Sequence, residues 1–227
     1  MRIGVILSGC GVYDGSEIHE AVFTLLSIHE RGAEAVCFAP DIDQYHVVDH
    51  ITGDEMPEVR NVLVESARIA RGNIRPLSEL KASALDALVL PGGFGAAKNL
   101  SRWAFSGPDG DIEPGVRAAI ADMLSLGKPV AGLCMGPTLI AKALEGSDVH
   151  AELTVGSVSA PSPYDIGAIS AGMEKTGAVA VMRTVDEIQV DIKNKIVTAP
   201  CYMMEAGIVE IRKNVDRAIE AMIGLIS

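Results

Sequence analysis

The chain has 227 residues, 48% of them hydrophobic, which fits one large domain whose core needs neither disulfides nor metals. Its formal net charge is -11, which argues against nucleic acid or an anionic membrane surface as a partner. No apolar stretch reaches the roughly 18 residues of a membrane span. The N-terminus lacks the parts of a secretory signal, and the four cysteines form no C-x-x-C pair. These features predict a cytoplasmic protein with free thiols.

Short apolar runs rich in β-branched residues alternate with longer segments of helical period. In chain order, the sequence predicts strands at 3–7, 34–38, 85–90, 129–133, 178–181, 188–191 and 196–198. It predicts helices at 15–31, 58–71, 115–126, 135–144 and 204–226. This alternation is typical of an α/β fold with a doubly wound, mostly parallel sheet and helices on both faces. Ligands of such sheets bind beyond the carboxyl ends of the strands.

Residues 41–75 combine a polar loop, the helix expected at 58–71 and two histidines. We interpret this segment as an insertion or lid near the ligand-binding edge of a single domain spanning 1–227. His46 and His50 have the i, i+4 spacing that would align them on a helix.

A metal site at these histidines would need a third ligand, such as Asp49 or Asp54. It would also need a helix, which the β-branched pair Val47–Val48 does not favour. The histidines are therefore interpreted as solvated lid residues, and no metal site is predicted.

Cys134 lies in the segment KPVAGLCMGPTLIAKAL, where the strand expected at 129–133 meets a helix with almost no loop between them. Gly132 and Gly136 flank it in a G-x-C-x-G pattern, the cysteine counterpart of a nucleophile elbow. We expect a sparsely allowed backbone conformation at Cys134, and a thiol pKa lowered by helix N-terminal N–H groups and the helix dipole. The alternative is that Cys134 is a buried, inert cysteine, but the flanking glycines favour the interpretation as a reactive cysteine.

The segment PGGFG, residues 91–95, follows the third expected strand. Glycines at this place let backbone amides approach a ligand, so the segment predicts an oxyanion-binding concavity next to Cys134. It is too short and too poor in lysine for a nucleotide phosphate loop. The alternative is an ordinary turn.

The segment DGSEIHEA, residues 14–21, opens the first expected helix at the same edge of the sheet. Glu17 could hydrogen-bond the thiolate or move a proton as a general acid or base. Alternatively, Ser16 or Asp14 caps the helix, and the negative charge of Glu17 merely interacts favourably with the helix dipole. The spacing alone leaves both open, for Glu17 and for the neighbouring His19.

These pieces, in this order, resemble the ThiJ/PfpI superfamily, which has a flavodoxin-like, class I glutamine amidotransferase-like fold. The chain most resembles its ElbB branch, the "enhancing lycopene biosynthesis" or isoprenoid-biosynthesis glyoxalases. The resemblance covers nearly the whole chain, and the segments that carry it are IGVILSGCGVYDGSEIHEA at 3–21, TGDEM and RNVLVESARIARG within 52–72, PGGFGAAKNLS at 91–101 and NKIVTAP at 194–200.

The resemblance implies roles for individual residues. Cys134 is the elbow nucleophile and Glu17 its carboxylate partner, while Gly92 and Gly93 supply amides that face the sulfur. Met135, directly after the nucleophile, joins these glycines as a substrate- or oxyanion-binding residue.

No histidine follows Cys134 directly, as it does in protease-like members, and no Cys-His-Glu pattern of amidotransferases is visible. Peptidase and glutaminase activities are therefore not expected. His150, which lies 16 residues after Cys134, could serve as a surrogate, but it has no orienting partner that the sequence identifies.

The resemblance implies a lyase-type, cofactor-free glyoxalase that converts glyoxal or methylglyoxal, small aldehyde substrates, to the hydroxy acid. It also implies a link to isoprenoid biosynthesis and a homodimer. An alternative of a different class is a redox-sensing or stress-response protein whose Cys134 is oxidised.

The remaining cysteines and the tryptophan are given structural roles. We expect Cys10 to form a wall of the Cys134 pocket rather than to act as a resolving thiol. Cys37 and Cys201 are interpreted as core residues at strand ends, and Trp103 as a packing residue.

Overall fold

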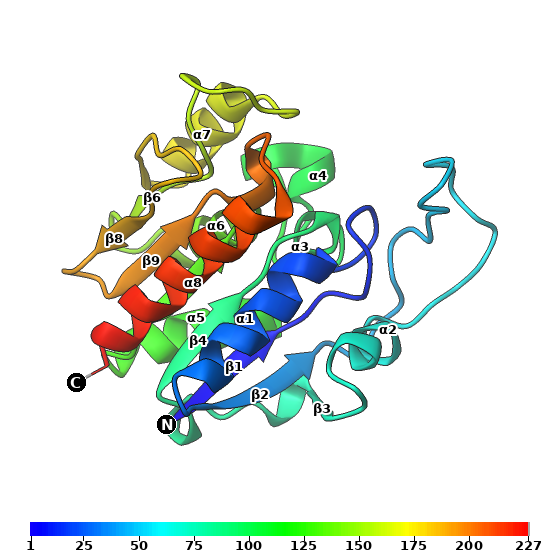
Figure 1. Ribbon diagram of the computed structural model, residues 1–227, viewed down its shortest axis with the longest axis horizontal. Coiled ribbons are helices and arrows are strands. Elements are labelled where there is room, and N and C mark those ends of the chain that lie inside the picture. Colours follow the sequence, from blue (N-terminus) through cyan, green and yellow to red (C-terminus); the bar gives the residue numbers. More distant parts are fainter. Residues whose placement is uncertain (227) are drawn as a thin grey trace.

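The computed structural model describes residues 1–226 and contains a seven-stranded sheet in the order β3-β2-β1-β4-β5-β9-β8 (Figure 1). All neighbouring strands of this sheet are parallel except β8, which runs antiparallel to β9. A second sheet pairs β6 with β7. The strands are β1 (Arg2–Ile6), β2 (Glu34–Ala39), β3 (Ile74–Pro76), β4 (Ala87–Leu90), β5 (Val130–Leu133), β6 (Glu152–Leu153), β7 (Val179–Ala180), β8 (Gln189–Asp191) and β9 (Ile196–Ala199).

Helices cover both faces of the large sheet, and α1 and α8 lie together on one of them (Figure 1). Helices α3, α5 and α6 pack on the opposite face. The α-helices are α1 (Ile18–Glu30), α2 (Val62–Ile69), α3 (Phe94–Lys98), α4 (Trp103–Ser106), α5 (Pro114–Ser125), α6 (Gly136–Leu144), α7 (Ile166–Lys175) and α8 (Ile208–Gly224). Short 3-10 helices span Leu77–Glu79, Ala82–Ala84, Gly107–Asp109 and Cys201–Met203. The predicted flavodoxin-like, doubly wound, mostly parallel sheet is confirmed.

The central strands β4 and β5 are apolar at every position because both of their faces are buried. In β4, Leu88 and Leu90 belong to the core cluster under α5 and α6, whereas Ala87 and Val89 belong to the cluster under α1 and α8. Successive side chains of a strand point to opposite faces, so this one strand contributes to two cores.

The structure differs from the sequence-based expectations at several elements. The strand expected at 178–181 lies in the small second sheet, and the last helix begins at Ile208, four residues later than expected. Strand β3 and helices α3 and α7 were not expected. Helix α7 contains Gly167 and Gly172, which lower its intrinsic helix propensity, so tertiary packing rather than local sequence stabilises it.

Within residues 1–226, no helix is both long enough and apolar enough to cross a membrane. Strands β1, β4, β5 and β9 are parallel neighbours, so their carboxyl ends lie at one edge of the sheet. The loops that leave this edge carry the residues of the candidate site.

Candidate active site

Cys134 forms a tight turn between β5 and α6. Its φ of 55° lies in the left-handed region, which is rare for a residue other than glycine, so the predicted strained elbow is confirmed. Its backbone N–H donates to the carbonyl oxygen of Ala199 on β9 at 2.9 Å. A Cβ on Gly136 would lie 2.4 Å from the Leu90 carbonyl oxygen, so only glycine lets α6 pack this close to β4.

The carboxyl group that hydrogen-bonds the Cys134 thiol belongs to Glu20, on the first turn of α1. Glu20 is 0% exposed, and each of its carboxyl oxygens also accepts a backbone N–H. The N–H of Gly92 donates to Oε2 at 3.1 Å, and the N–H of Tyr202 donates to Oε1 at 3.2 Å. These contacts fix the carboxyl group beside the sulfur.

The sequence analysis did not single out Glu20, although a signal was present. Glu20 shares the buried side of α1 with Ala21, Thr24 and Ile28. A glutamate on the apolar side of an amphipathic helix is rarely buried without a specific partner. Its position there therefore marks it as a residue with a function.

Burial, together with a smaller effect of the negative charge of Glu17, raises the pKa of Glu20 to about 8. Burial also raises the pKa of the Cys134 thiol well above its ordinary value, and the charge of Glu20 adds to this shift. The backbone N–H groups of Gly93 and Met135 act in the opposite direction because they stabilise a thiolate. The expected lowering of the thiol pKa is therefore wrong: the N–H groups are present, but the loss of hydration outweighs them.

The two glycines after β4 have different partners. Gly92 uses its N–H for Glu20, and its carbonyl oxygen accepts the N–H of Glu17 at 3.0 Å. A Cβ on Gly92 would lie 2.3 Å from the Cβ of Cys134, so a side chain is excluded there. Gly93 has a φ of 97° and directs its N–H at the sulfur. The binding of a substrate oxygen by Gly92, Gly93 and Met135 stays a prediction.

Glu17 itself caps α1, so the expected cap at Ser16 or Asp14 is wrong. The expected pairing of Glu17 with the Cys134 thiol is also wrong, because Glu20 holds that position, and a role of Glu17 in proton transfer stays a prediction. Oε2 of Glu17 accepts the backbone N–H of Glu20 at 2.7 Å, and burial raises the pKa of Glu17. His19 is exposed and hydrogen-bonds the Tyr202 hydroxyl through Nδ1 at 2.9 Å. Its Nδ1 lies 3.9 Å from Oε1 of Glu17.

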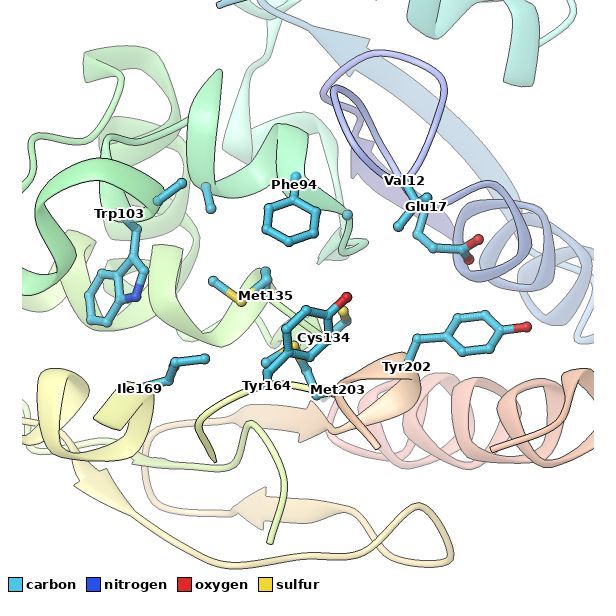
Figure 2. Close-up of a pocket in the computed structure, with 13 residues that line it drawn as sticks. Val12, Glu17, Phe94, Trp103, Cys134, Met135, Tyr164, Ile169, Tyr202 and Met203 are labelled. Atoms are coloured by element: carbon cyan, nitrogen blue, oxygen red, sulfur yellow. The ribbon is translucent and has the colours of Figure 1, made fainter. Parts of the chain in front are cut away.

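A cavity of about 240 Å³ opens above Cys134 (Figure 2). Trp103 and Ile169 lie at one end of it and Glu17 and Tyr202 at the other, with Cys134 between them. Most of the wall is apolar. The lining residues are Val12, Glu17, Gly93, Phe94, Ala97, Trp103, Ala104, Cys134, Met135, Tyr164, Ile169, Tyr202 and Met203.

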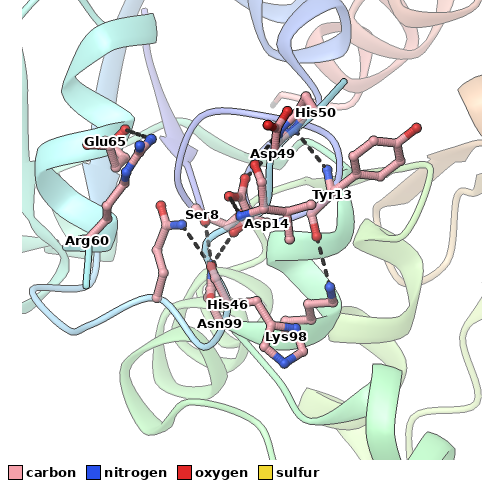
Figure 3. A network of polar contacts seen from close by, with 12 residues as sticks. Ser8, Tyr13, Asp14, His46, Asp49, His50, Arg60, Glu65, Lys98 and Asn99 are labelled. Atoms are coloured by element: carbon pink, nitrogen blue, oxygen red, sulfur yellow. Dashed lines mark hydrogen bonds and ion pairs between the residues drawn. The ribbon is translucent and has the colours of Figure 1, made fainter. Parts of the chain in front are cut away.

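The segment 41–61 docks on the loop after β1 and does not form part of this cavity (Figure 3). His46 and His50 are not on a helix, and the described residues contain no group of three or more ligands that could hold a metal ion. His50 accepts the backbone N–H of Tyr13 at Nε2, 3.2 Å away. The carboxylate of Asp14, 4% exposed, accepts the N–H of Val48 at 2.8 Å and so holds the segment in place.

Other predicted residues lie away from the thiol or in unexpected places. Cys10 does not line the cavity, so its expected role as a wall is wrong; it lies near Glu65 instead. His150 is exposed, and its Nδ1 contacts the Gly177 carbonyl oxygen at 2.8 Å. Trp103 is buried as expected of a packing residue, but it also lines the cavity, which was not predicted.

Comparison with known proteins adds evidence for the family. No family model matches the sequence. The chain is 42% identical to human "Glutamine amidotransferase-like class 1 domain-containing protein 3, mitochondrial" over 228 residues, which cover 99% of this chain and 83% of that protein. It is 41% identical to the rat "ES1 protein homolog, mitochondrial", with 99% of this chain and 84% of that protein covered.

A crystal structure of an isoprenoid biosynthesis protein with an amidotransferase-like domain, from Ehrlichia chaffeensis, superposes with a TM-score of 0.90. It is 32% identical, and the match covers 100% of both chains. The chain belongs to the ElbB branch of the ThiJ/PfpI, class I glutamine amidotransferase-like superfamily. Drosophila melanogaster DJ-1beta, at 15% identity and a TM-score of 0.55, shares the fold with this ElbB-branch protein.

The relatives also correct one expectation. The human and rat relatives are named as mitochondrial proteins, and this finding contradicts the predicted cytoplasmic location. The prediction rested on the lack of a secretory signal, of a membrane span and of paired cysteines in the sequence.

Proposed function

We propose that this protein is a cofactor-independent glyoxalase that converts glyoxal to glycolate and methylglyoxal to lactate. The observation that carries the proposal is the placement of a strained cysteine and two glutamates around one cavity. Glu20 contacts the sulfur from inside the protein, whereas Glu17 faces the cavity beside it. This arrangement provides a nucleophile and a separate acid or base for the substrate carbons.

The reaction begins when the Cys134 sulfur adds to the aldehyde carbon. Glu20 and Cys134 are coupled acids, and the pair carries a single negative charge in a fraction of molecules that grows toward pH 8. The sulfur of this form makes the C–S bond, and the aldehyde oxygen takes a proton from water. The product is a hemithioacetal, and the N–H groups of Gly93 and Met135 stabilise its developing negative charge.

The ionised Glu17 removes the hydrogen of the former aldehyde carbon as a proton, which gives an enediolate. The hydroxyl proton of the former aldehyde oxygen passes to the neighbouring oxygen, and Glu17 returns its proton to the neighbouring carbon. A thioester of the 2-hydroxy acid thus forms on Cys134, and Glu17 is ionised again. Water then attacks the thioester carbonyl and releases the acid and the thiol. Overall, the oxoaldehyde and one water give the 2-hydroxy acid. The aldehyde carbon is oxidised, and the neighbouring carbonyl carbon is reduced.

Peptidase and glutaminase reactions lack the histidine that would carry a proton to the leaving amine. Among the described residues that line the cavity, none is a histidine. His150, the surrogate considered from the sequence, is occupied by the Gly177 carbonyl oxygen.

The test is incubation of the purified protein with methylglyoxal and measurement of lactate by a coupled assay. We expect kcat/KM to fall by more than about a hundredfold in Cys134→Ala and Glu17→Gln, which remove the nucleophile and the proton carrier. Cys10→Ser is the matched control, because this half-buried thiol lies outside the cavity and its loss should leave kcat/KM unchanged. Absence of lactate from the wild-type protein, or full activity of Cys134→Ala, would disprove the proposal.

A second candidate function is redox sensing, favoured by the N–H groups of Gly93 and Met135 at the sulfur. Oxidation by a hydroperoxide would convert the thiol to a sulfenic acid and release water or an alcohol, and these N–H groups would hold the added oxygen. Mass spectrometry after peroxide treatment tests this role. Selective oxygen uptake at Cys134, without aldehyde turnover, would support the sensor and exclude the enzyme.

The homodimer, the single domain spanning 1–227 and the link to isoprenoid biosynthesis are parts of the same proposal. The name of the Ehrlichia chaffeensis protein supports the last of these. Light scattering on the purified protein tests the dimer.

A further inference from the structure

Glyoxal and methylglyoxal occupy only a small part of the cavity above Cys134. Its volume is about 240 Å³, which corresponds to about eight liquid waters at roughly 30 Å³ each. The small aldehydes have two and three carbons. The rest of the space must be explained by another part of the true substrate or by bound water.

The unexplained space is the end of the cavity away from the glutamates. Figure 2 shows Trp103 and Ile169 at this end, with Met135 between them and Cys134. Ala97 and Ala104 add small apolar side chains to the lining of the cavity. Water gains little in such a place, because a buried water needs two to four polar partners.

The indole of Trp103 is fixed rather than adaptable. Trp103 is 7% exposed, and α7 packs directly on its outer edge. A Cβ on Gly172 would lie 3.0 Å from Cζ2 of the indole, so a larger residue would push the ring. The apolar end is therefore a preformed recess in which an aromatic or branched group can stack on an immobile ring.

We propose that the apolar end of the cavity is a binding subsite, and that the substrate is an α-oxoaldehyde carrying an aryl or bulky alkyl group in this subsite. The inference rests on the proposed glyoxalase function for the reaction. The aldehyde carbon lies at Cys134, the two oxygens lie toward the amides and Glu17, and the apolar group lies against Trp103 and Ile169.

The kinetic test compares methylglyoxal with phenylglyoxal, whose products are lactate and mandelate. Burying a group of this size changes kcat/KM by at least roughly tenfold, so we expect phenylglyoxal to be preferred by that factor or more. Ile169→Phe fills the subsite and should lower the preference about tenfold. Ala168→Phe is the matched control, since it adds the same side chain to an exposed position of α7 and should leave the preference unchanged. Each variant is compared with wild type on both aldehydes, so the difference in intrinsic reactivity between the two aldehydes cancels.

A binding test works without turnover. Trp103 is the single tryptophan of the chain, so intrinsic fluorescence reports directly on the subsite. In Cys134→Ala, which cannot form a hemithioacetal, titration with 2-hexanone should change this fluorescence at a concentration at least roughly tenfold lower than titration with acetone.

The outcomes separate the subsite from the reaction. Binding of 2-hexanone without turnover of any aldehyde would support the subsite and disprove the glyoxalase. Turnover with no preference for phenylglyoxal, together with equal weak binding of both ketones, would overturn the subsite and leave the glyoxalase standing. Absence of both turnover and binding would overturn both.

Discussion

Glu20 is a carboxyl group with no access to water, and its proton equilibrium is coupled to folding. It accepts two backbone N–H groups and contacts a thiol, and none of the described residues forms an ion pair with it. Burial therefore favours the neutral form of this carboxyl group, which explains why its pKa is about 8 and not 4.5. A protonated Glu20 can donate to the sulfur, so the residue is suited to stabilise a charge on Cys134 when that charge forms.

This pKa predicts a dependence of stability on pH. In the unfolded chain Glu20 loses its proton near pH 4.5, whereas in the folded protein it keeps the proton up to about pH 8. The folded state therefore binds more protons in this window, and the free energy of unfolding falls as pH rises through it. The shift corresponds to roughly 5 kcal/mol at 1.36 kcal/mol per pKa unit.

Urea denaturation of wild type and Glu20→Gln between pH 4.5 and 9 measures this contribution. The amide cannot ionise, so the free energy of unfolding should fall less steeply in the variant, even though it loses one accepted hydrogen bond at every pH. Glu30→Gln, at the exposed end of the same helix, is the control for removing a carboxyl group. Parallel curves for wild type and Glu20→Gln would show that Glu20 is ionised in the folded protein throughout.

At the level of residues, the sequence predicted the nucleophile better than its environment. Cys134 is marked by two glycines and a strand-to-helix junction, which are local features. The partner of its thiol depends on the angle at which α1 crosses the sheet, which no local pattern reveals. The same holds for Trp103, which reaches the cavity through a loop and the short helix α4.

Among the elements, the unit of β5, Cys134 and α6 is held by close backbone packing. Gly132 and Gly136 face each other across the turn, with only 2.9 Å between a Cβ on Gly132 and the carbonyl carbon of Gly136. Helix α6 is buried along its whole length. Any increase in the distance between α6 and β4 would therefore move the sulfur as well.

Gly136→Ala tests this packing. Its Cβ would overlap the Leu90 carbonyl oxygen, so we expect the free energy of unfolding to fall by roughly 1 to 3 kcal/mol and the rate of Cys134 alkylation to change. Gly224→Ala is the matched control, since no atom lies within 4 Å of the added Cβ in α8. That variant should be neutral or more stable by up to about 1 kcal/mol. Equal stability of Gly136→Ala and wild type in urea denaturation would contradict the packing argument.

The elements that the sequence predicted are those with strong periodic patterns. The central strands β4 and β5 are continuous apolar runs, and β1 and β9 are apolar except at Arg2 and Thr198, which is how a strand buried on both faces appears in a sequence. Of the missed elements, β3 and α3 have only three and five residues. Elements this short form because neighbouring segments position them, so their own residues contain too little information to predict them.

For the whole molecule, the side chain of Asn99 joins three segments that are distant in sequence (Figure 3). Its Nδ2 donates to the carbonyl oxygens of Ser8 and Asp14 at 2.9 and 2.8 Å, and its Oδ1 accepts the N–H of Tyr45 at 2.9 Å. The loop after β1, the segment 41–61 and the end of α3 thus share one amide group. This group connects the docked segment to the loop that carries Val12 of the cavity.

Asn99→Ala should loosen this docking. Three backbone groups lose their partner at a site that is 7% exposed, so we expect the free energy of unfolding to fall by roughly 2 to 4 kcal/mol. Limited proteolysis should cleave within 41–61 faster than in wild type. Asn73→Ala removes an exposed asparagine whose side chain makes no hydrogen bond with any described residue, and it should change neither property. Unchanged proteolysis of Asn99→Ala would show that other contacts hold the segment.

Both borders of the large sheet are closed to a further strand. On one border, β3 has only three residues and ends at Pro76, which has no N–H to offer a neighbour. On the other border, β8 is bound to Glu152 of β6 by two hydrogen bonds. The backbone N–H of Glu152 donates to the carboxylate of Asp191 at 3.0 Å, and the side-chain amide of Gln189 donates to the carboxylate of Glu152 at 2.7 Å. We therefore expect that copies of this protein do not associate by extending the seven-stranded sheet of one into that of the next.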